Sequence, residues 1–198
     1  MIFDERTALV VVDMQNDFAH PEGSLYVEGG DEVVTAVNDR IAEATAAGAT
    51  VVYTQDWHPE STPHFEKDGG IWPVHCVHDT WGSAFHDDLA VLPDAEVIRK
   101  GTQGEDGYSG FSVRDPENPS DTTPTRLETH LRDRGIERVV VAGLATDYCV
   151  KETALDAARL GFETFFLSDA AAAVNLEPGD GERAVAEMRR AGAGIVGG

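Results

Sequence analysis

Short apolar runs rich in β-branched residues recur along the chain, and they limit the folds that it can adopt. Each run has the length of a β-strand, and its apolar residues are continuous, as in strands that are covered on both faces. We expect six strands, the last of them weak: Ala8–Val12, Thr50–Thr54, Glu96–Ile98, Arg138–Ala142, Phe162–Leu167 and Ile195–Val196.

Helical patterns separate several of these runs. We expect helices at Glu32–Ala47, Thr125–Arg134, Asp147–Leu160 and Gly181–Ala191. Thr125 and Glu128 match a capping box, and Thr146 or Asp147 is placed to cap the helix that follows. Strands that alternate with helices form βαβ units. The pattern predicts an α/β fold of three layers, α/β/α and Rossmann-like, with a mostly parallel sheet of roughly six strands.

Two segments are longer than the usual connections of compact domains, residues 55–93 and 101–124. Loops of this length are usually functional or disordered. The first holds five of the seven histidines, which favours a functional loop. A length of 198 residues suits one domain. We therefore expect a single domain over residues 1–198, with a long functional loop at about 55–93.

The charge of the chain is strongly negative. Thirty-six acidic residues against 15 basic ones give a formal charge of −21, and only three of the basic residues are lysines. Such a charge strains a compact fold by self-repulsion in dilute buffer, whereas molar salt shortens the screening length to about 3 Å. We expect a halophilic protein; an acidic protein of ordinary salinity is the alternative. Nucleic acids and anionic membranes are unfavourable partners.

The sequence also indicates a cellular compartment. It contains no apolar run of 18 residues, and its first residues lack the basic flank and cleavage site of a signal peptide. Cys76 and Cys149 are too few for a disulfide framework, so we expect two free thiols. These features predict a cytoplasmic protein, and they leave a homo-oligomer open.

Three residues suited to covalent catalysis lie at the carboxyl ends of expected strands. Asp13 and Lys100 follow the first and third runs, and Cys149 begins the helix after the fourth. These positions share one edge of a parallel sheet, where ligands gather. A helix N-terminus lowers the pKa of a thiol, and a nearby carboxylate can move its proton. Cys149 alone is more often a buried small side chain, and Asp13 alone means little in so acidic a chain. Lys100 is the stronger candidate because the chain otherwise avoids lysine, and the prediction rests on the three together.

A second group of polar residues lies in the loop at about 55–93. Asp56 and His58 follow the second strand, and His64 and His75 come after them. One carboxylate and three imidazoles suit one divalent metal: zinc first, with iron or manganese as alternatives. His78 is a rival for the fourth position, and for any one histidine an exposed loop is the alternative.

Six segments together resemble the nicotinamidase (pyrazinamidase) branch of the isochorismatase-like cysteine hydrolases. They are ALVVVDMQNDF at 8–18, DWHPESTPHF at 56–65, WPVHCV at 72–77, RKG at 99–101, YSGF at 108–111 and VAGLATDYCV at 141–150. They occur in the order of the family. The resemblance implies an enzyme that hydrolyses nicotinamide to nicotinic acid and ammonia, a step of NAD salvage, with nicotinamide or a related small amide as its substrate.

The resemblance also implies roles for the candidate residues. Asp13 is then the base that activates Cys149, whose thiolate attacks the amide, and Lys100 holds both. The backbone N–H groups of Ala145 and Cys149 form the oxyanion hole, with a cis peptide at Leu144–Ala145.

A further set of residues would bind the substrate if the resemblance holds. The metal at Asp56, His58, His64 and His75 then binds the pyridine nitrogen. Phe18, Trp72, Tyr108 and Leu144 line the substrate pocket. Tyr148 departs from the family, because many relatives carry histidine at that position.

Two other functions remain as alternatives. The same Asp13, Lys100 and Cys149 set could hydrolyse a different small amide, but such relatives generally lack the metal residues. A metal-binding or interaction protein of the same fold that has lost catalysis is the second alternative. Cys149 argues against it, because a binding module needs no nucleophile.

Overall fold

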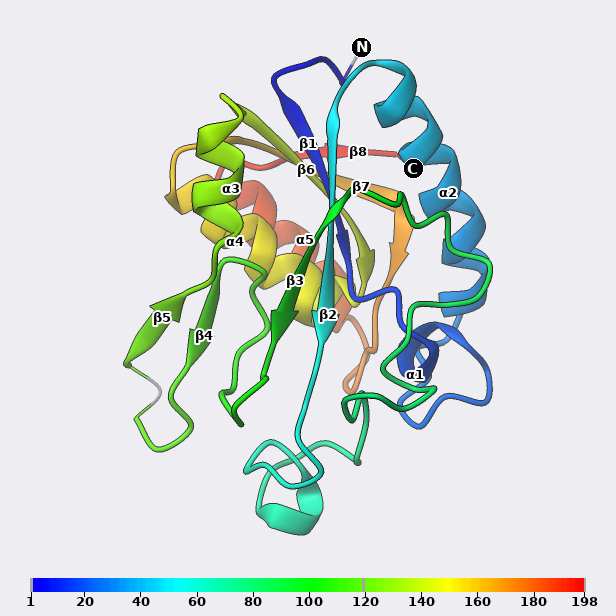
Figure 1. The fold of residues 1–198 in the computed structure, drawn as a ribbon, viewed down its shortest axis with the longest axis vertical. Helices are drawn as coiled ribbons and strands as arrows, with labels where there is room; N and C mark the ends of the chain where they lie inside the picture. Colours follow the sequence, from blue (N-terminus) through cyan, green and yellow to red (C-terminus); the bar gives the residue numbers. More distant parts are fainter. Residues whose placement is uncertain (1, 119, 198) are drawn as a thin grey trace.

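A parallel sheet of six strands forms the centre of the protein. The computed structural model describes residues 2–118 and 120–197, so residues 1 and 198 of the expected domain, and residue 119 in the second long loop, lie outside the described residues. The strands are β1 (Thr7–Val12), β2 (Thr50–Asp56), β3 (Glu96–Lys100), β6 (Arg138–Leu144), β7 (Glu163–Ala172) and β8 (Gly194–Val196). Their order is β3-β2-β1-β6-β7-β8 (Figure 1). The predicted α/β class and parallel sheet are confirmed.

Helices cover both faces of this sheet. The main helices are α2 (Gly30–Ala46), α3 (Leu127–Asp133), α4 (Lys151–Arg159) and α5 (Asp180–Arg190). Leu9 and Val11 of β1 pack in the cluster that contains α2. Val10 and Val12 point the other way, into the cluster that contains α3, α4 and α5. Figure 1 shows these two layers on opposite sides of the sheet. Burial on both faces explains why the β1 run is apolar throughout.

The longest helix, α2, is amphipathic. Its buried residues recur with helical spacing and include Val33, Val37, Ile41 and Ala44. Acidic residues of the same helix, such as Asp31 and Asp39, are exposed. Across residues 2–118 and 120–197, no helix has the length and the apolar character that crossing a membrane requires.

The strands that follow β1 in the sequence are added first on one side of it and then, from β6 onward, on the other side. From β1 the chain moves outward through β2 to β3, and it then returns to place β6 on the other side of β1. In open α/β sheets, ligands bind beyond the carboxyl ends of strands at such a reversal. Asp13 follows β1 directly, and Cys149 lies five residues after the end of β6. The topology therefore brings both residues to the expected edge.

The two long loops differ in their content. Within the described residues of the first loop, a short 3₁₀ helix (Glu66–Asp68) is the regular element after β2, and a short helix α1 (Asn16–Ala19) lies beside the same end of the sheet. The second loop contains an antiparallel hairpin of β4 (Ser112–Arg114) and β5 (Thr122–Pro124). The sequence did not predict this hairpin, because its strands are only three residues long and β5 is exposed.

The predicted capping box of Thr125 and Glu128 does not form, and neither Thr146 nor Asp147 caps α4. Helix α3 begins at Leu127, with Arg126 at its cap position. The Thr125 hydroxyl accepts the Leu127 N–H, as a capping side chain does, and donates to the Gly110 carbonyl, but the Thr125 N–H donates to the Phe111 carbonyl instead of to Glu128. A π-helix (Thr146–Val150) precedes α4, and Ala145 occupies its cap position. The Asp147 carboxylate accepts hydrogen bonds from the backbone of residues 174 and 175. It therefore joins the π-helix to the segment after β7.

Candidate active site

Asp13, Lys100 and Cys149 lie together at the carboxyl edge of the sheet. The Lys100 Nζ is 2.8 Å from Asp13 Oδ2 and 3.6 Å from Cys149 Sγ. All three are buried, and Lys100 is 1% exposed. Thr54 donates its hydroxyl to Asp13 Oδ1 over 2.5 Å and accepts the Asp13 N–H. The structure thus holds a carboxylate, an ammonium and a thiol in contact at a buried position.

The electrostatics of this cluster follow from burial and from Lys100. Burial raises the pKa of Asp13, and Lys100 opposes part of the shift. Burial disfavours the charge of Lys100, but neighbouring carboxylates outweigh it and raise the Lys100 pKa well above its ordinary value. Burial also raises the pKa of the Cys149 thiol well above its ordinary value, against the influence of Lys100. Burial thus outweighs the effect of Lys100, and the thiol needs a base to ionise.

Asp56 joins this cluster to the histidines. Its Oδ1 is 2.5 Å from Lys100 Nζ, while its Oδ2 faces His58 Nε2 at 3.7 Å and His75 Nε2 at 3.9 Å. Burial raises the pKa of Asp56, but Lys100 and the histidines outweigh burial and hold that pKa well below its usual range. Asp56 is therefore a carboxylate shared by both groups of residues.

His58, His64 and His75 offer ring nitrogens that all lie within 4.8 Å of one another. Among the described residues, neither ring nitrogen of His58 has a hydrogen-bond partner, although both are buried. Burial lowers the pKa of His75 to about 4, so its imidazole is neutral at ordinary pH. Three imidazoles whose ring nitrogens lie close together beside a carboxylate are a donor set that fits a divalent metal. His78, the rival ligand, is instead exposed and contacts Asp79.

Backbone contacts restrict how these rings can turn. The His75 Nδ1 lies 2.7 Å from the Pro73 carbonyl, so Nδ1 carries the proton and Nε2 keeps its lone pair. A Cβ added to Gly101, which has a φ of +75°, would lie 2.5 Å from His58 Nδ1. The glycine of the RKG segment therefore makes room for the His58 ring.

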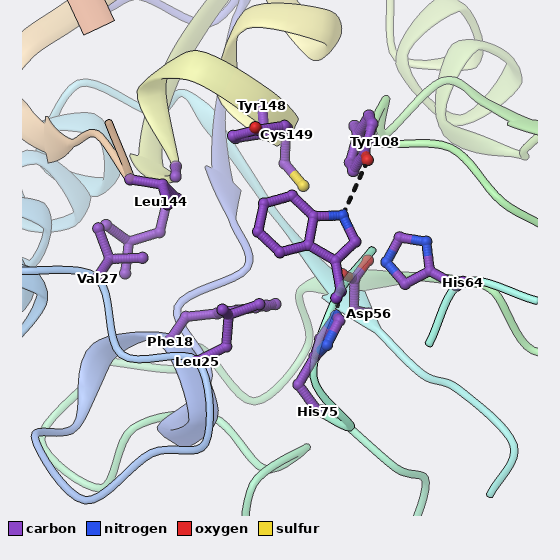
Figure 2. Close-up of a pocket in the computed structure, with 13 residues that line it drawn as sticks. Phe18, Leu25, Val27, Asp56, His64, His75, Tyr108, Leu144, Tyr148 and Cys149 are labelled. Carbon is purple, nitrogen blue, oxygen red and sulfur yellow. Dashed lines mark hydrogen bonds and ion pairs between the residues drawn. The ribbon is translucent and has the colours of Figure 1, made fainter. Parts of the chain in front are cut away.

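A single pocket opens onto both groups of residues. Figure 2 shows Cys149 and Tyr148 facing Phe18 across it, with His64, His75 and Asp56 along another side. The lining residues are Phe18, Leu25, Val27, Asp56, His64, Trp72, His75, Tyr108, Leu144, Ala145, Tyr148, Cys149 and Val174. The four expected substrate residues and both expected oxyanion residues are all among them. The Leu144–Ala145 peptide is cis, as expected.

Comparison with known proteins agrees with this arrangement. The chain matches the isochorismatase domain over residues 7–197. It belongs to the isochorismatase family. The nicotinamidase/pyrazinamidase of Mycobacterium tuberculosis is 40% identical, over 96% of this chain and 97% of that protein, and the nicotinamidase of Escherichia coli is 37% identical, over 94% and 92%. The resemblance to the nicotinamidase branch is confirmed.

A solved structure supports the same family assignment. The pyrazinamidase of Pyrococcus horikoshii in complex with zinc has a TM-score of 0.87 and 42% identity, and the match covers 98% of this chain and 99% of that one. This isochorismatase-family chain therefore shares both its fold and much of its sequence with a zinc-bound relative. The zinc is bound in the structure of that relative.

Sequence reasoning missed Gln15, which holds the backbone of Asp56. The Gln15 amide donates to the carbonyl groups of Asp56 and Ser83 over 2.7 and 2.9 Å, and its oxygen accepts the Asp56 N–H over 2.8 Å. Gln15, in the turn that follows Asp13, thus holds the backbone of Asp56, whose carboxylate is shared by both clusters. The sequence signal that could have identified Gln15 is its place in the DMQNDF segment, which is part of the family resemblance.

Tyr148 was also missed as a pocket residue. Its ring packs edge-on against Trp72 at 4.9 Å and against Tyr108 at 5.3 Å, and the Trp72 indole N–H donates to the Tyr108 hydroxyl over 3.0 Å. The three rings come from three separate segments of the chain. In the sequence, Tyr148 stands out only as a departure from the family pattern, whereas in the structure its ring forms part of the pocket wall.

Proposed function

We propose that the protein hydrolyses nicotinamide to nicotinic acid and ammonia, a step of NAD salvage, through a thioester on Cys149. One observation carries this proposal: a buried Asp13, Lys100 and Cys149 cluster and a histidine cluster share Asp56 and open on one aromatic pocket. The names of the matching proteins of M. tuberculosis and E. coli support nicotinamide over other amides.

Asp13 takes the proton of the Cys149 thiol, and the sulfur attacks the amide carbon. The Lys100 ammonium, 3.6 Å from the sulfur, stabilises the thiolate as it forms. The raised pKa makes Asp13 a stronger base than an exposed aspartate. When the carbon–nitrogen bond breaks, Asp13 returns the proton to the nitrogen and ammonia leaves. Water then gives a proton to Asp13 and attacks the thioester, which yields nicotinic acid and the free thiol.

The oxygen of the substrate amide becomes negatively charged during both attacks. The backbone N–H groups of Ala145 and Cys149 are the proposed donors to it, and both residues line the pocket beside the sulfur. Donors that are fixed before the reaction stabilise such charge without reorganisation. The hydrogen bonds of Asp147 to residues 174 and 175 hold the π-helix that carries one of these donors.

The histidine cluster gives the pocket a site for one divalent metal, held by Asp56, His58, His64 and His75. A metal bound there supplies an electrophilic centre for the ring nitrogen of the substrate, which orients the amide toward Cys149. Imidazole and carboxylate donors suit zinc, and a zinc-bound relative supports that choice over iron or manganese. Phe18 and Trp72 offer flat apolar surfaces to the substrate ring.

The test of the proposed function is product analysis with paired substrates. Zinc-loaded protein is expected to release ammonia and nicotinic acid in equal amounts from nicotinamide. Benzamide is the matched control because it has the same shape without the ring nitrogen, so its kcat/KM is expected to be much lower. Turnover of an aliphatic amide with none of nicotinamide would favour an amidohydrolase for a different small substrate.

We further propose that the protein is adapted to high salt. Its formal charge of −21 is self-repelling, and salt at about 1 M shortens the screening length to about 3 Å. The melting temperature is expected to rise by several degrees between dilute buffer and molar sodium chloride. Sucrose solutions of matched osmolality serve as the uncharged control in a thermal scan. A melting temperature that is flat or falls with added salt would contradict the adaptation.

We place the protein in the cytoplasm. Cys76 and Cys149 are both free thiols, as expected in a reducing compartment. The negative charge favours small-molecule substrates over nucleic acids and anionic membranes as partners.

A further inference from the structure

The loop between β3 and β4 places a carboxylate on the outer side of the histidine cluster. Asp106 Oδ1 lies 2.8 Å from His64 Nδ1 and also accepts the Gly107 N–H over 2.7 Å. His64 is buried, and the Asp106 side chain is 41% exposed. Asp106 lies outside the set of residues that the proposed reaction uses.

The contact fixes the tautomer of His64. A carboxylate only accepts hydrogen bonds, so the His64 Nδ1 carries the proton and Nε2 keeps a free lone pair. The Pro73 carbonyl does the same for His75 over 2.7 Å. The two rings thus present equivalent nitrogens to the cluster, but the partner of His64 is charged and comes from a different loop.

The backbone holds Asp106 firmly. Its N–H donates to the Arg114 carbonyl over 2.9 Å, and its carbonyl accepts the Arg114 N–H over 2.6 Å, so Asp106 is paired with the end of β4. Two residues further on, the Tyr108 hydroxyl accepts the Trp72 indole N–H. The loop that carries Asp106 and Tyr108 therefore contacts the histidine loop at two points, and Figure 2 shows His64 and Tyr108 on the same side of the pocket.

We propose that Asp106 is a positioning residue for the metal. It holds His64 in the orientation in which Nε2 faces the other ligands, and through this contact metal binding also fixes the segment 104–110 that forms one wall of the pocket. The inference rests on the metal set of the proposed function. Outer carboxylate partners of histidine ligands orient the ring and raise its basicity.

The experiment measures zinc affinity directly, by competition with a chromogenic chelator. Asp106→Ala is expected to weaken zinc binding by about 10- to 100-fold, and Asp106→Asn by less, because its amide oxygen still accepts the His64 proton without the charge. Glu105→Gln is the matched control. The Glu105 carboxylate accepts the Gln103 N–H on the same loop, so this change removes one charge and leaves the Asp106 contact intact. The control is expected to bind zinc as the wild type does.

A second readout follows the loop itself. Zinc is expected to slow amide hydrogen exchange in residues 104–110 of the wild type and of Glu105→Gln, and to slow it much less in Asp106→Ala. Melting temperatures of the metal-free proteins identify a variant that fails to fold, in which case Asp106→Asn, which keeps the size of the side chain, decides the question.

Two outcomes would overturn the proposal. One is wild-type zinc affinity in both Asp106 variants, and the other is a wild-type protein that binds no zinc at all. Failure of the proposed function is a separate result, because zinc-bound wild-type protein that leaves nicotinamide intact would still show whether Asp106 controls metal affinity.

Discussion

Replacing Cys149 with alanine is expected to lower kcat for nicotinamide by about 10⁵- to 10⁶-fold, as removal of a covalent nucleophile does in other acyl-transfer enzymes. The substituted side chain loses only the sulfur, which touches Lys100 and faces the pocket. Asp13, Lys100 and the histidines remain in place. Zinc affinity is therefore expected to stay at the wild-type value while turnover is lost, and ammonia release measured beside chelator competition checks both.

Cys76→Ala is the matched control for this substitution. Cys76 is also a buried free thiol, and its sulfur contacts the Gly82 carbonyl at 3.9 Å instead of the lysine. Burial raises the pKa of both thiols well above the ordinary value, but Cys76 is not among the residues that line the pocket, so its sulfur is not placed to attack the substrate. This variant is expected to keep most of its activity. Ammonia release by Cys149→Ala at the rate of Cys76→Ala would exclude the thioester mechanism.

Replacing Lys100 with methionine is expected to abolish turnover and to lower the free energy of unfolding by about 3–5 kcal/mol, because the change leaves buried carboxylates without their cation. Lys100 contacts both Asp13 and Asp56, and all three are buried. The cost is expected to shrink as the pH falls, since Asp13 tolerates burial once it is protonated. Urea unfolding of the metal-free protein at several pH values measures it.

A second substitution separates stability from catalysis in this cluster. Adding Asp13→Asn to Lys100→Met removes one of the two unpaired carboxylates, so part of the lost stability is expected to return. Activity is not expected to return, because the base is missing as well. A Lys100→Met protein as stable as the wild type at neutral pH would contradict the electrostatic account of the cluster.

The sheet could be predicted because each central strand is buried on both faces. β1 and β6 contain apolar runs rich in β-branched residues, and the structure begins β2, β3 and β6 at the residues where their runs begin. The prediction ended β7 at Leu167, whereas the strand continues to Ala172. Its last residues, SDAAA, carry no β-branched side chain, so only the pairing with β6 makes them a strand.

The helix caps could not be predicted because tertiary contacts compete for the same side chains. The Thr125 hydroxyl donates to the Gly110 carbonyl, 15 positions earlier, and the Asp147 carboxylate accepts backbone N–H groups after β7. Local sequence gives both residues the chemistry of a cap. The structure uses that chemistry to join segments that lie far apart in the sequence.

In the candidate site, too, residues at strand ends could be predicted, whereas residues that depend on long-range contacts could not. Asp13, Asp56 and Lys100 could be placed from the sequence because each ends or follows a parallel strand. Their supporting residues could not, since Asp106 lies 42 positions from His64 and Gln15 lies 41 positions from Asp56. These contacts depend on how the loops pack above the sheet.

The most direct test of the account is ammonia release from nicotinamide in molar salt, with purified protein as isolated, stripped by chelator, and supplied again with zinc, iron(II) or manganese. The account predicts that stripping removes activity, that one of these metals restores it, and that nicotinic acid accompanies the ammonia in equal amount. Folded, metal-loaded protein that releases no ammonia from nicotinamide would contradict it.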